Sequence, residues 1–313
     1  MSAPPTWRHG GGYPAGMEPR TEQAALLALF RDRKDKWGAL ADEIELCGSA
    51  LTVLERGGRG PGGQGELFSE PSLIADDVAR AQADIDQWTD DGLRLVTLLD
   101  PDYPPQLLTI HQRPPFLFYR GRLDSHDAAG VAIVGTRKPT EQGLSRASAI
   151  ATGLAERGVS VVSGLAEGID TAAHAAALAA GGRTVAVIGT GLRRTYPPAN
   201  TALQDRIARE HLVLSQFWPD AAPSKTSFPM RNAVMSGYAA ATVVIEAAWK
   251  SGARMQARLA LEHGRPVFLH DSLLEHDWAR SYLARGAVIV TSAEDVLAAL
   301  DERLNTDVEL VWA

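Results

Sequence analysis

Short apolar runs alternate with helical segments over the last two thirds of the chain. Residues 131–134 and 159–162 are largely apolar, which is typical of strands buried on both faces of a sheet. Between them, apolar residues recur at helical spacing until Gly158, which ends the predicted helix. Further apolar runs follow at regular intervals, at residues 184–188, 212–214, 242–246, 266–270 and 287–290. This alternation predicts an α/β fold with a mostly parallel sheet and helices on both faces.

The first third of the chain has a different pattern. Residues 1–20 are rich in glycine and proline, and we predict a disordered tail because such a segment cannot offset the entropy of ordering. Helical spacing predicts short helices over 21–56 and a longer one over 71–91, with a glycine-rich break at 57–65 between them. We therefore expect a small helical domain over residues 21–92, followed by the α/β domain over residues 93–313.

Composition limits the class of protein. The 313 residues are 45% hydrophobic, which is enough for a sizeable core, and no apolar run approaches the ~20 residues that span a bilayer. The first twenty residues contain no hydrophobic signal segment, so we predict a cytoplasmic protein. The single cysteine, Cys47, excludes an intramolecular disulfide and is expected to be a small buried hydrophobe. The net charge of −7 argues against coating nucleic acid through bulk charge, but it allows a local basic groove.

Two glycine turns follow the first two strands of the predicted sheet. Their small, polar and cationic residues are Gly135, Thr136 and Arg137 in the first turn, and Ser163, Gly164 and Gly168 in the second. Turns after neighbouring parallel strands open at the same edge of a sheet, where such folds bind ligands. The first turn leads into a helix, whose free N–H groups favour an anion, and Arg137 could hold a phosphate bidentately. The alternative is an arginine that is simply solvated.

Two enzyme classes are considered and set aside. Gly189-Thr190-Gly191 follows a strand, but a dinucleotide fingerprint needs a third glycine that opens a helix, and no Walker A sequence is present. Asp170 and His174 lie one helical turn apart, and Ser163 is close in sequence, as a hydrolase triad requires. The residue two positions before Ser163 is Val161 rather than the glycine of a nucleophile elbow. We therefore interpret Asp170 as a cap or turn ligand and His174 as an internal hydrogen-bonded histidine.

Metal and cofactor sites are not predicted. His263, His270 and His276 lack the spacing of a metal-binding helix. Residues 224–265, by contrast, are rich in cations: Lys225, Arg231, Lys250, Arg254, Arg258 and Arg265. Aromatic residues are interleaved with them: Phe228, Tyr238 and Trp249. A cationic groove with aromatic faces suits single-stranded nucleic acid, because bases stack on rings while phosphates meet the charges. The alternative, which we prefer for Tyr238 and Trp249 individually, is that the aromatic residues belong to the core.

With these residues in view, the sequence resembles the DNA-processing protein A family (DprA, also called Smf). The resemblance rests on DYPPQLLTI at residues 102–110, VAIVGTRKPTEQG at 131–143, SGLAEGIDTAAHAAAL at 163–178, FPMRNAVMSG at 228–237 and VVIEAAWKSGARMQA at 243–257. It implies a Rossmann-like core preceded by a sterile-alpha-motif-like helical domain, a homodimer, and no catalytic activity. It further implies binding of single-stranded DNA and loading of RecA during natural transformation.

The resemblance also implies a phosphate pocket at the carboxyl edge of the sheet. The residues that it carries over are Gly135, Thr136, Arg137, Ser163, Gly164, Phe228, Arg231 and Asn232. To these we add Gly168, Lys225, Lys250, Ser251 and Gly252 as further candidates for binding DNA.

The sequence departs from the family at several positions. Gln216 stands where members usually have glutamate, Ala233 where they usually have a second arginine, and Glu167 where some transformation proteins have a basic residue. Residues 266–287 replace a typical proline-glycine turn and glycine-asparagine segment, and we expect no carboxy-terminal winged helix.

The predicted function is a non-enzymatic single-strand DNA binder that acts in DNA uptake, natural transformation or recombination and uses no cofactor. One alternative is a nucleotide-binding sensor of the same superfamily. Phosphoribohydrolases of that superfamily need a PGGxGTxxE motif, which the segment from Glu246 to Gly252 lacks. A second alternative is a specialised paralogue in phage defence or genome maintenance.

Overall fold

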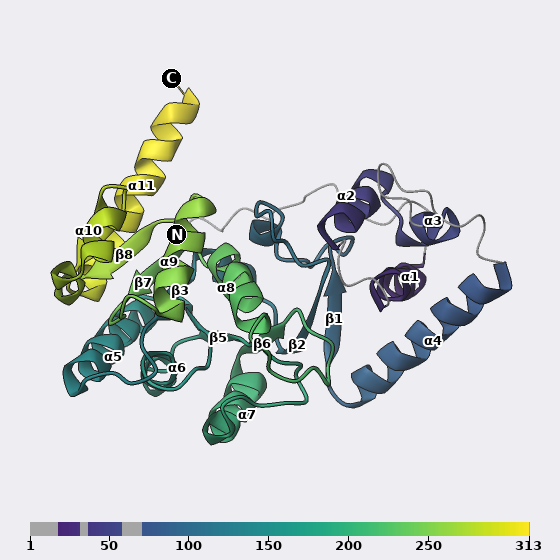
Figure 1. Ribbon diagram of the computed structural model, residues 1–313, viewed down its shortest axis with the longest axis horizontal. Helices are drawn as coiled ribbons and strands as arrows, with labels where there is room; N and C mark the ends of the chain where they lie inside the picture. Colours follow the sequence, from purple (N-terminus) through teal and green to yellow (C-terminus); the bar gives the residue numbers. More distant parts are fainter. Residues whose placement is uncertain (1–17, 32–36, 58–70, 313) are drawn as a thin grey trace. The chain divides into compact units, whose positions relative to one another are not determined.

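The computed structural model describes residues 18–31, 37–57 and 71–312. The chain divides into two compact units, which are described separately (Figure 1). The first unit contains the described residues up to Tyr103 together with Pro114–Leu117. The second unit contains Pro104–Arg113 and the chain from Phe118 onward.

The first unit is mainly helical, as predicted. Its elements are α1 (Pro19–Arg31), α2 (Trp37–Cys47), α3 (Ala50–Glu55), α4 (Pro71–Asp90) and β1 (Arg94–Thr97). Pro19 and Arg20, which we counted in the tail, form the start of α1, and the rest of the predicted tail lies outside the described residues. Most of the predicted 57–65 break also lies outside them. The likeness of this unit to a sterile alpha motif stays a prediction.

A buried glutamate fastens two of these helices. Glu22 of α1 is almost fully buried, and its carboxylate accepts hydrogen bonds from the Ser49 hydroxyl at 2.8 Å and the Ala50 N–H at 2.6 Å. Both donors lie at the start of α3, where backbone N–H groups lack partners within the helix. The carboxylate therefore satisfies the start of α3 and holds it against α1.

The second unit is built on a mostly parallel sheet, which confirms the predicted α/β class. Its strands are residues 118–121 of β2 (Phe116–Gly121), β3 (Val131–Val134), β4 (Val161–Ser163), β5 (Thr184–Val187), β6 (Leu212–Ser215), β7 (Ala241–Val244), β8 (Val267–His270) and β9 (Val288–Val290). They lie in the order β2-β6-β5-β4-β3-β7-β8-β9, with residues 118–121 of β2 antiparallel to β6 and the other pairs parallel. The strand order reverses at β3, from which one half of the sheet runs toward β6 and the other toward β9.

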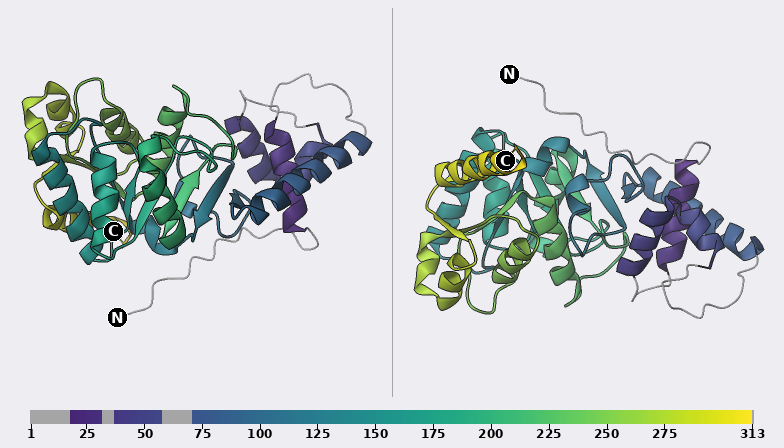
Figure 2. Two further views of the ribbon diagram at one scale, coloured as in Figure 1. Left: turned by 90° about the horizontal axis from the view of Figure 1, so that it is seen from below. Right: turned by 90° about the horizontal axis from the view of Figure 1, so that it is seen from above.

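Helices cover both faces of this sheet. They are α5 (Glu141–Glu156), α6 (Ile169–Ala179), α7 (Thr201–Glu210), α8 (Ser227–Tyr238), α9 (Gly252–Glu262), α10 (Asp277–Leu283) and α11 (Ala293–Trp312). Figure 1 shows α5, α6 and α7 on one side of the strands and α8 and α9 on the other. Seen from below, the teal helices lie in front of the strands (Figure 2, left). Short 3-10 turns connect the elements at Pro105–Leu107, Ser125–Ala129, Pro198–Asn200 and Asp271–Glu275.

The core forms where the predicted apolar runs meet the apolar stripe of α5. Val131 and Ile133 of β3 pack with Ile150 and Leu154 of α5 and with Phe268 of β8, and all five are buried. Sequence periodicity predicted the ends of the elements, and the exposure of residues near them, less accurately. The second predicted strand, 159–162, is observed at 161–163, and Leu144 is partly exposed although it fits the apolar stripe of α5.

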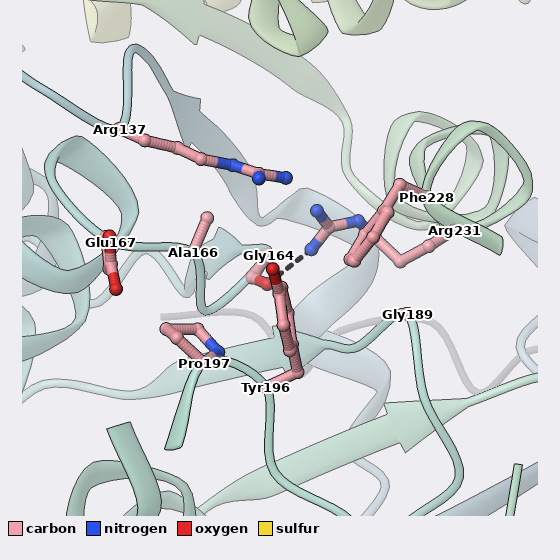
Figure 3. A pocket seen from close by; sticks show the side chains of 9 residues that line it. All are labelled: Arg137, Gly164, Ala166, Glu167, Gly189, Tyr196, Pro197, Phe228 and Arg231. Carbon is pink, nitrogen blue, oxygen red and sulfur yellow. Dashed lines mark hydrogen bonds between the residues drawn. The ribbon is translucent and has the colours of Figure 1, made fainter. Parts of the chain in front are cut away.

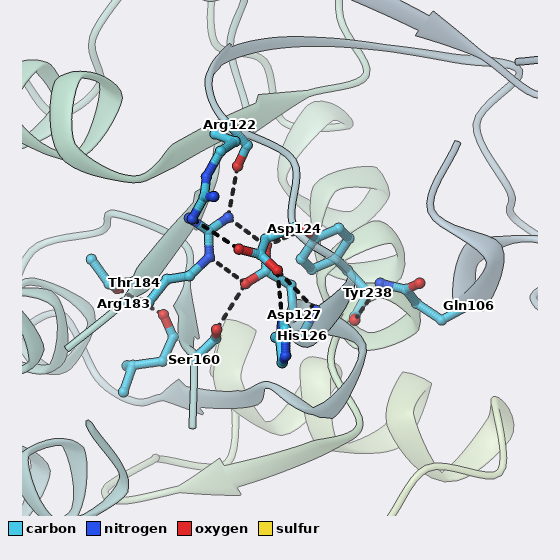
Figure 4. A network of polar contacts seen from close by, with 10 residues as sticks. Gln106, Arg122, Asp124, His126, Asp127, Ser160, Arg183, Thr184 and Tyr238 are labelled. Carbon is cyan, nitrogen blue, oxygen red and sulfur yellow. Dashed lines mark hydrogen bonds and ion pairs between the residues drawn. The ribbon is translucent and has the colours of Figure 1, made fainter. Parts of the chain in front are cut away.

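The amino-terminal edge of the sheet is closed by a buried ion pair (Figure 4). Asp127, which is fully buried, accepts hydrogen bonds from Nε and Nη2 of Arg183 at 2.6 and 2.7 Å. The Ser160 hydroxyl and the Tyr238 hydroxyl also donate to Asp127, at 2.7 and 2.8 Å. Burial raises the pKa of Tyr238 well above its usual value, and the charge of Asp127 raises it further. These groups precede β3, β4 and β5 or end α8, so the network fixes the edge opposite to the strand ends.

Two further expectations concern the whole chain. No helix in the ranges 18–31, 37–57 and 71–312 is long and apolar enough to cross a membrane. Cys47 is a free thiol that is only partly buried, so the expectation of a fully buried cysteine was wrong.

Candidate functional site

A pocket opens at the carboxyl edge of the sheet, beyond β3, β4 and β5 (Figure 3). It is lined by Arg137, Gly164, Ala166, Glu167, Gly189, Tyr196, Pro197, Phe228 and Arg231. These residues come from the loops that follow the three strands and from the first turn and a half of α8. The pocket therefore lies where doubly wound sheets bind ligands.

Arg231 forms the floor of this pocket. Its side chain is only 6% exposed, and its Nη1 donates to the carbonyl oxygens of Gly164 and of Val187, the latter at 2.9 Å. Its Nε donates to Oδ1 of Asn232 at 2.9 Å. A guanidinium carries five N–H groups, so this arrangement fixes its plane and leaves donors for a ligand.

The glycine at position 164 makes room for Arg231. A side chain there would overlap the guanidinium, because a Cβ built on Gly164 falls within contact distance of Nη1. The Gly164 peptide also bridges two charged groups: its N–H donates to Asp170 at 3.1 Å and its carbonyl accepts from Arg231. Burial raises the pKa of Asp170, and the positive charge of Arg231 opposes that rise. Asp170 thus acts as a turn ligand, as the sequence predicted.

Arg137 lies opposite Arg231 across the pocket. It is exposed, and Figure 3 shows both guanidinium groups pointing into the same space. Burial lowers the pKa of Arg231, and the nearby charge of Arg137 lowers it further, while Asp170 opposes the change. Within the described residues, Arg137 forms no ion pair. Two cations that face one space repel each other, and an anion between them would relieve that repulsion.

Two aromatic rings form the wall beside these cations. The rings of Tyr196 and Phe228 are tilted by 46°, with centroids 5.6 Å apart. The Cζ atom of Arg137 lies 5.3 Å from the centroid of the Phe228 ring. A Cβ built on Gly189 would lie only 2.9 Å from Cδ1 of Phe228, so a glycine is needed there for the ring to fit. Tyr196 is 41% exposed, which leaves its surface open for contact with a ligand.

Glu167 contributes the negative charge at the rim. Its side chain is exposed, and in Figure 3 its carboxylate lies away from the two guanidinium groups. It neutralises neither cation through an ion pair within the described part of the chain. The pocket therefore keeps a cationic centre with one acidic group at its edge.

Four of the residues predicted to bind phosphate line the pocket: Arg137, Gly164, Phe228 and Arg231. The other nine do not line it: Gly135, Thr136, Ser163, Gly168, Lys225, Asn232, Lys250, Ser251 and Gly252. Most of these nine have a structural task. Gly135 allows the close approach of Ile169, and Gly168, with φ of 83°, is the cap residue of α6.

The start of α5 differs from our expectation. We predicted that it would offer free N–H groups to an anion, but the carboxylate of Glu246 lies there. Its Oε2 accepts from the Thr140 N–H at 3.1 Å and from the Thr140 hydroxyl at 3.0 Å. The Thr136 N–H donates to the Glu246 backbone carbonyl at 2.7 Å. The Glu246 carboxylate thus takes the place at the start of α5 that we predicted for a ligand anion. The positive charge that remains for a ligand is that of the two pocket arginines.

The remaining predicted residues connect α8 with α9. Asn232 donates from Nδ2 to the carbonyl oxygen of Gly252 at 3.2 Å, and the Ser251 hydroxyl caps α9 by accepting from Ala253 and Arg254 N–H groups. Lys225 and Lys250 are exposed on the loops before α8 and α9. They supply charge around the pocket rather than within it.

The hydrolase triad is not assembled. The Ser163 hydroxyl donates to the Ile133 carbonyl at 2.6 Å rather than to a histidine. The Thr184 hydroxyl donates to the Val161 carbonyl, so it accepts the proton of His174 Nδ1 at 2.7 Å. Burial lowers the pKa of His174 to about 3, and the charge of Arg231 acts in the same direction. His174 is therefore a neutral core histidine, which confirms our interpretation.

Tyr196 and Gly189 were missed in the sequence. Both lie in a segment that we interpreted as a failed dinucleotide motif followed by a proline loop, and we assigned neither residue to the site. The available signal was an aromatic residue placed beside two prolines, close after a strand at the ligand edge. Within the described residues, no group of three histidine, cysteine, aspartate or glutamate side chains is arranged to hold a metal ion.

Comparison with known proteins identifies the family. The sequence model of DNA recombination-mediator protein A matches residues 94–301, which is more than half of the chain. The chain belongs to the DNA recombination-mediator protein A family. It is 45% identical over 205 residues to DNA processing protein DprA of Streptococcus pneumoniae, covering 64% of this chain and 72% of that protein. It is 42% identical over 208 residues to protein Smf of Synechocystis, covering 64% of this chain and only 52% of that protein.

Solved structures of family members share this fold. The X-ray structure of DprA from Streptococcus pneumoniae aligns with a TM-score of 0.69 and 33% identity, covering 89% of this chain and 95% of that one. A structure of DNA processing protein A from Helicobacter pylori, which describes a single-stranded DNA binding mode, aligns with a TM-score of 0.59 and 29% identity. That alignment covers 67% of this chain and 97% of the Helicobacter chain.

Proposed function

We propose that this protein binds single-stranded DNA through the pocket at the carboxyl edge of its sheet, with Arg137 and Arg231 as phosphate anchors. The observation that carries the proposal is the pair of guanidinium groups that face one space beside two aromatic rings. The Helicobacter relative, whose published structure concerns single-stranded DNA binding, supports the same ligand class.

The two arginines have complementary tasks in this proposal. Arg231 is buried and fixed by backbone carbonyls, so it presents a rigid donor at little further entropic cost on binding. Arg137 is exposed and closes on the phosphate from the open side, where it also lies near the Phe228 ring. Charge-assisted N–H···O contacts to phosphate are among the strong hydrogen bonds, so one phosphate would join both side chains.

The aromatic wall favours a single strand over a duplex. The Tyr196 and Phe228 rings lie beside the cations, where an unpaired base next to a bound phosphate can stack on them. Bases in a duplex are already stacked on one another and cannot reach such a ring without unpairing. This arrangement reads no base edge, so we expect little sequence preference.

We further propose that the protein acts without catalysis, as a recombination mediator in DNA uptake, natural transformation or recombination. The polar groups that resembled a triad, Ser163 and His174, are used in separate internal hydrogen bonds. RecA as the partner and a homodimer as the working form rest on the family resemblance alone. Action in phage defence remains a rival for the pathway rather than for the ligand.

A nucleotide sensor is the second candidate for the ligand. The pocket has a cavity volume of about 40 Å³. Pockets that enclose a drug-sized ligand have volumes of about 300 to 1,000 Å³. A strand that lays one phosphate in the pocket and runs along the edge fits this size better than an enclosed nucleotide.

The test is binding of a fluorescent oligothymidine, compared with a duplex of the same length and with a panel of mononucleotides. We expect the single strand to bind most tightly, with an affinity that falls with salt by a slope of about −0.7 per phosphate contact. Saturable binding of one nucleotide, with weak binding of the strand, would replace this proposal by the sensor.

A further inference from the structure

An exposed tryptophan lies on the turn between β7 and α9, outside the pocket. Trp249 is 57% exposed, whereas Tyr238, the other aromatic residue that we assigned to the core, is buried and bonded to Asp127. The expectation of core packing is thus right for Tyr238 and wrong for Trp249. An indole that remains this accessible contributes little to folding through burial.

One face of this indole is already occupied. The Cζ atom of Arg254 lies 3.9 Å from the Trp249 ring centroid, and Nη1 of Arg254 donates to the Trp249 carbonyl at 3.0 Å. Arg254 is itself held in the first turn of α9, where its N–H donates to the Ser251 hydroxyl and its carbonyl accepts from Tyr282. The guanidinium therefore holds the ring from one face, while more than half of the tryptophan stays accessible.

The turn that carries Trp249 opens at the same edge of the sheet as the pocket. Strand β7 pairs in parallel with β3, and Val134 lies opposite Val244, so the loops after these two strands are neighbours. One of these loops carries Arg137 and the other carries Trp249 and the exposed Lys250. The aromatic wall of the pocket lies on the other side of Arg137, toward β5.

A second link ties the two positions together. Asn232, which follows Arg231 in α8, donates to the carbonyl of Gly252 at 3.2 Å, three residues after Trp249. The start of α9 is thereby fastened to the helix that supplies the pocket floor. By the strand order β5-β4-β3-β7, the loops at this edge carry Tyr196, then Arg137, then Trp249 and Lys250. Rings and cationic residues thus alternate along the loops, which suits a single strand.

We propose that Trp249 is a second base-stacking site, which takes a nucleobase of the bound strand on the β7 side of the pocket. The inference rests on the proposed function, because it assigns a further contact to the same strand. Arg254 is a positioning residue that holds the ring, and Lys250 supplies charge for the adjoining phosphate. The site extends the strand path beyond the phosphate held by Arg137 and Arg231.

The test compares Trp249→Ala and Trp249→Phe with the unchanged protein, using oligothymidines of increasing length. Leu73→Ala is the matched control, because Leu73 is likewise 57% exposed and lies on α4 of the first unit. We expect Trp249→Ala to weaken binding of long strands about fivefold or more, the lower bound for one base stacked on an aromatic ring. Trp249→Phe should restore part of the loss, and the shortest strand that still binds should be indifferent to both changes.

A second measurement locates the base. A set of long strands, each with one abasic nucleotide at a different position, is titrated against the unchanged protein and against Trp249→Ala. One abasic position should weaken binding to the unchanged protein and have no added effect in Trp249→Ala, because the two changes remove the same contact. Quenching of tryptophan fluorescence by the strand should fall in Trp249→Phe.

These outcomes separate this inference from the proposed function. If all variants bind every strand as the unchanged protein does, the stacking site is refuted while single-strand binding stands. If the unchanged protein binds no single strand, the proposed function itself fails. A changed oligomeric mass in Trp249→Ala with unaltered strand binding would assign the indole to a protein contact and overturn the inference.

Discussion

Replacement of Arg137 by alanine is the most direct test of the pocket. The side chain is exposed and forms no ion pair within the described part of the chain, so its removal leaves no buried charge without a partner. Its contact with the Phe228 ring, 5.3 Å from Cζ to the centroid, is a cation–π interaction at an exposed site, for which about 0.5 to 1 kcal/mol is typical. The variant should therefore fold, with a melting temperature within a few degrees of the unchanged protein.

The expected effect on DNA is larger than the effect on stability. A hydrogen bond to a charged group contributes about 1.5 to 3 kcal/mol. Because Arg137 is solvated in the free protein, we expect the lower end of this range, which corresponds to about a tenfold weaker Kd at low salt. Loss of one phosphate contact should also reduce the slope of log K against log salt by about 0.7.

The assay is fluorescence anisotropy of an oligothymidine at several salt concentrations, with two comparison variants. Arg157→Ala removes an equal charge at the carboxyl end of α5, which returns the chain to the opposite edge of the sheet. It should change neither Kd nor slope beyond a small general effect. Arg137→Lys should keep the salt slope but lose part of the affinity, because an ammonium cannot bind phosphate bidentately. Equal affinities and slopes for Arg137→Ala and Arg157→Ala would refute the assignment of Arg137 as a phosphate anchor.

Three further changes test the surroundings of the pocket. Gly164→Ala should displace Arg231, which should weaken strand binding and lower the free energy of unfolding by about 1 to 3 kcal/mol, with a lower melting temperature. Gly252→Ala is its control: the added Cβ would lie 4.0 Å from its nearest neighbour, so the free energy of unfolding should change far less. Glu167→Gln should tighten strand binding about two- to fivefold at low salt and lose this effect at high salt, and a weaker Kd would contradict the repulsion. His174 has a folded pKa of about 3, below its unfolded value of about 6.5, so its contribution to stability is present above pH 6.5 and is lost as the pH falls toward 3. Urea unfolding measures the fall in the free energy of unfolding between pH 7.5 and pH 5, and this fall should be about 2 kcal/mol smaller in His174→Gln than in the unchanged protein. An equal fall in both proteins would show that the imidazole is not held neutral.

The fold could be predicted from local pattern because a strand buried on both faces is mainly apolar. The runs that became β3, β5, β7 and β8 are mainly apolar for this reason, and the helices between them favour parallel pairing. The ends of the strands were predicted less accurately. Val159 is apolar but lies before β4, because it belongs to the turn that follows Gly158 and the strand begins only at Val161.

The site could be predicted only in part because its residues come from distant segments. Arg137 lies three residues after the end of β3, so its place at the ligand edge follows from the sequence. Arg231 and Phe228 lie on α8, far along the chain, and only the family resemblance joined them to Arg137. Tyr196 was missed because the prolines beside it indicated a loop and gave no sign of what the loop would face.

The role of Glu246 could not be read from local pattern at all. Its carboxylate accepts from Thr140, the N-cap residue of α5, which lies 106 residues earlier in the chain. A strand end and a helix start become neighbours only when β7 pairs with β3. Long-range pairing of this kind decides whether a helix terminus is free for a ligand, and the pairing cannot be deduced from the local pattern of a single sequence.

The burial of Arg231 links ligand binding to the stability of the whole second unit. A cation that is held by two backbone carbonyls between α8 and the sheet exists in this arrangement only in the folded protein. An anion that binds there has no equivalent site in the unfolded chain, so it must raise the unfolding free energy, by about 2.7 kcal/mol at a concentration one hundred times Kd. The melting temperature thus becomes a label-free gauge of occupancy, by which unlabelled strands, nucleotides and inorganic phosphate can be ranked on one scale.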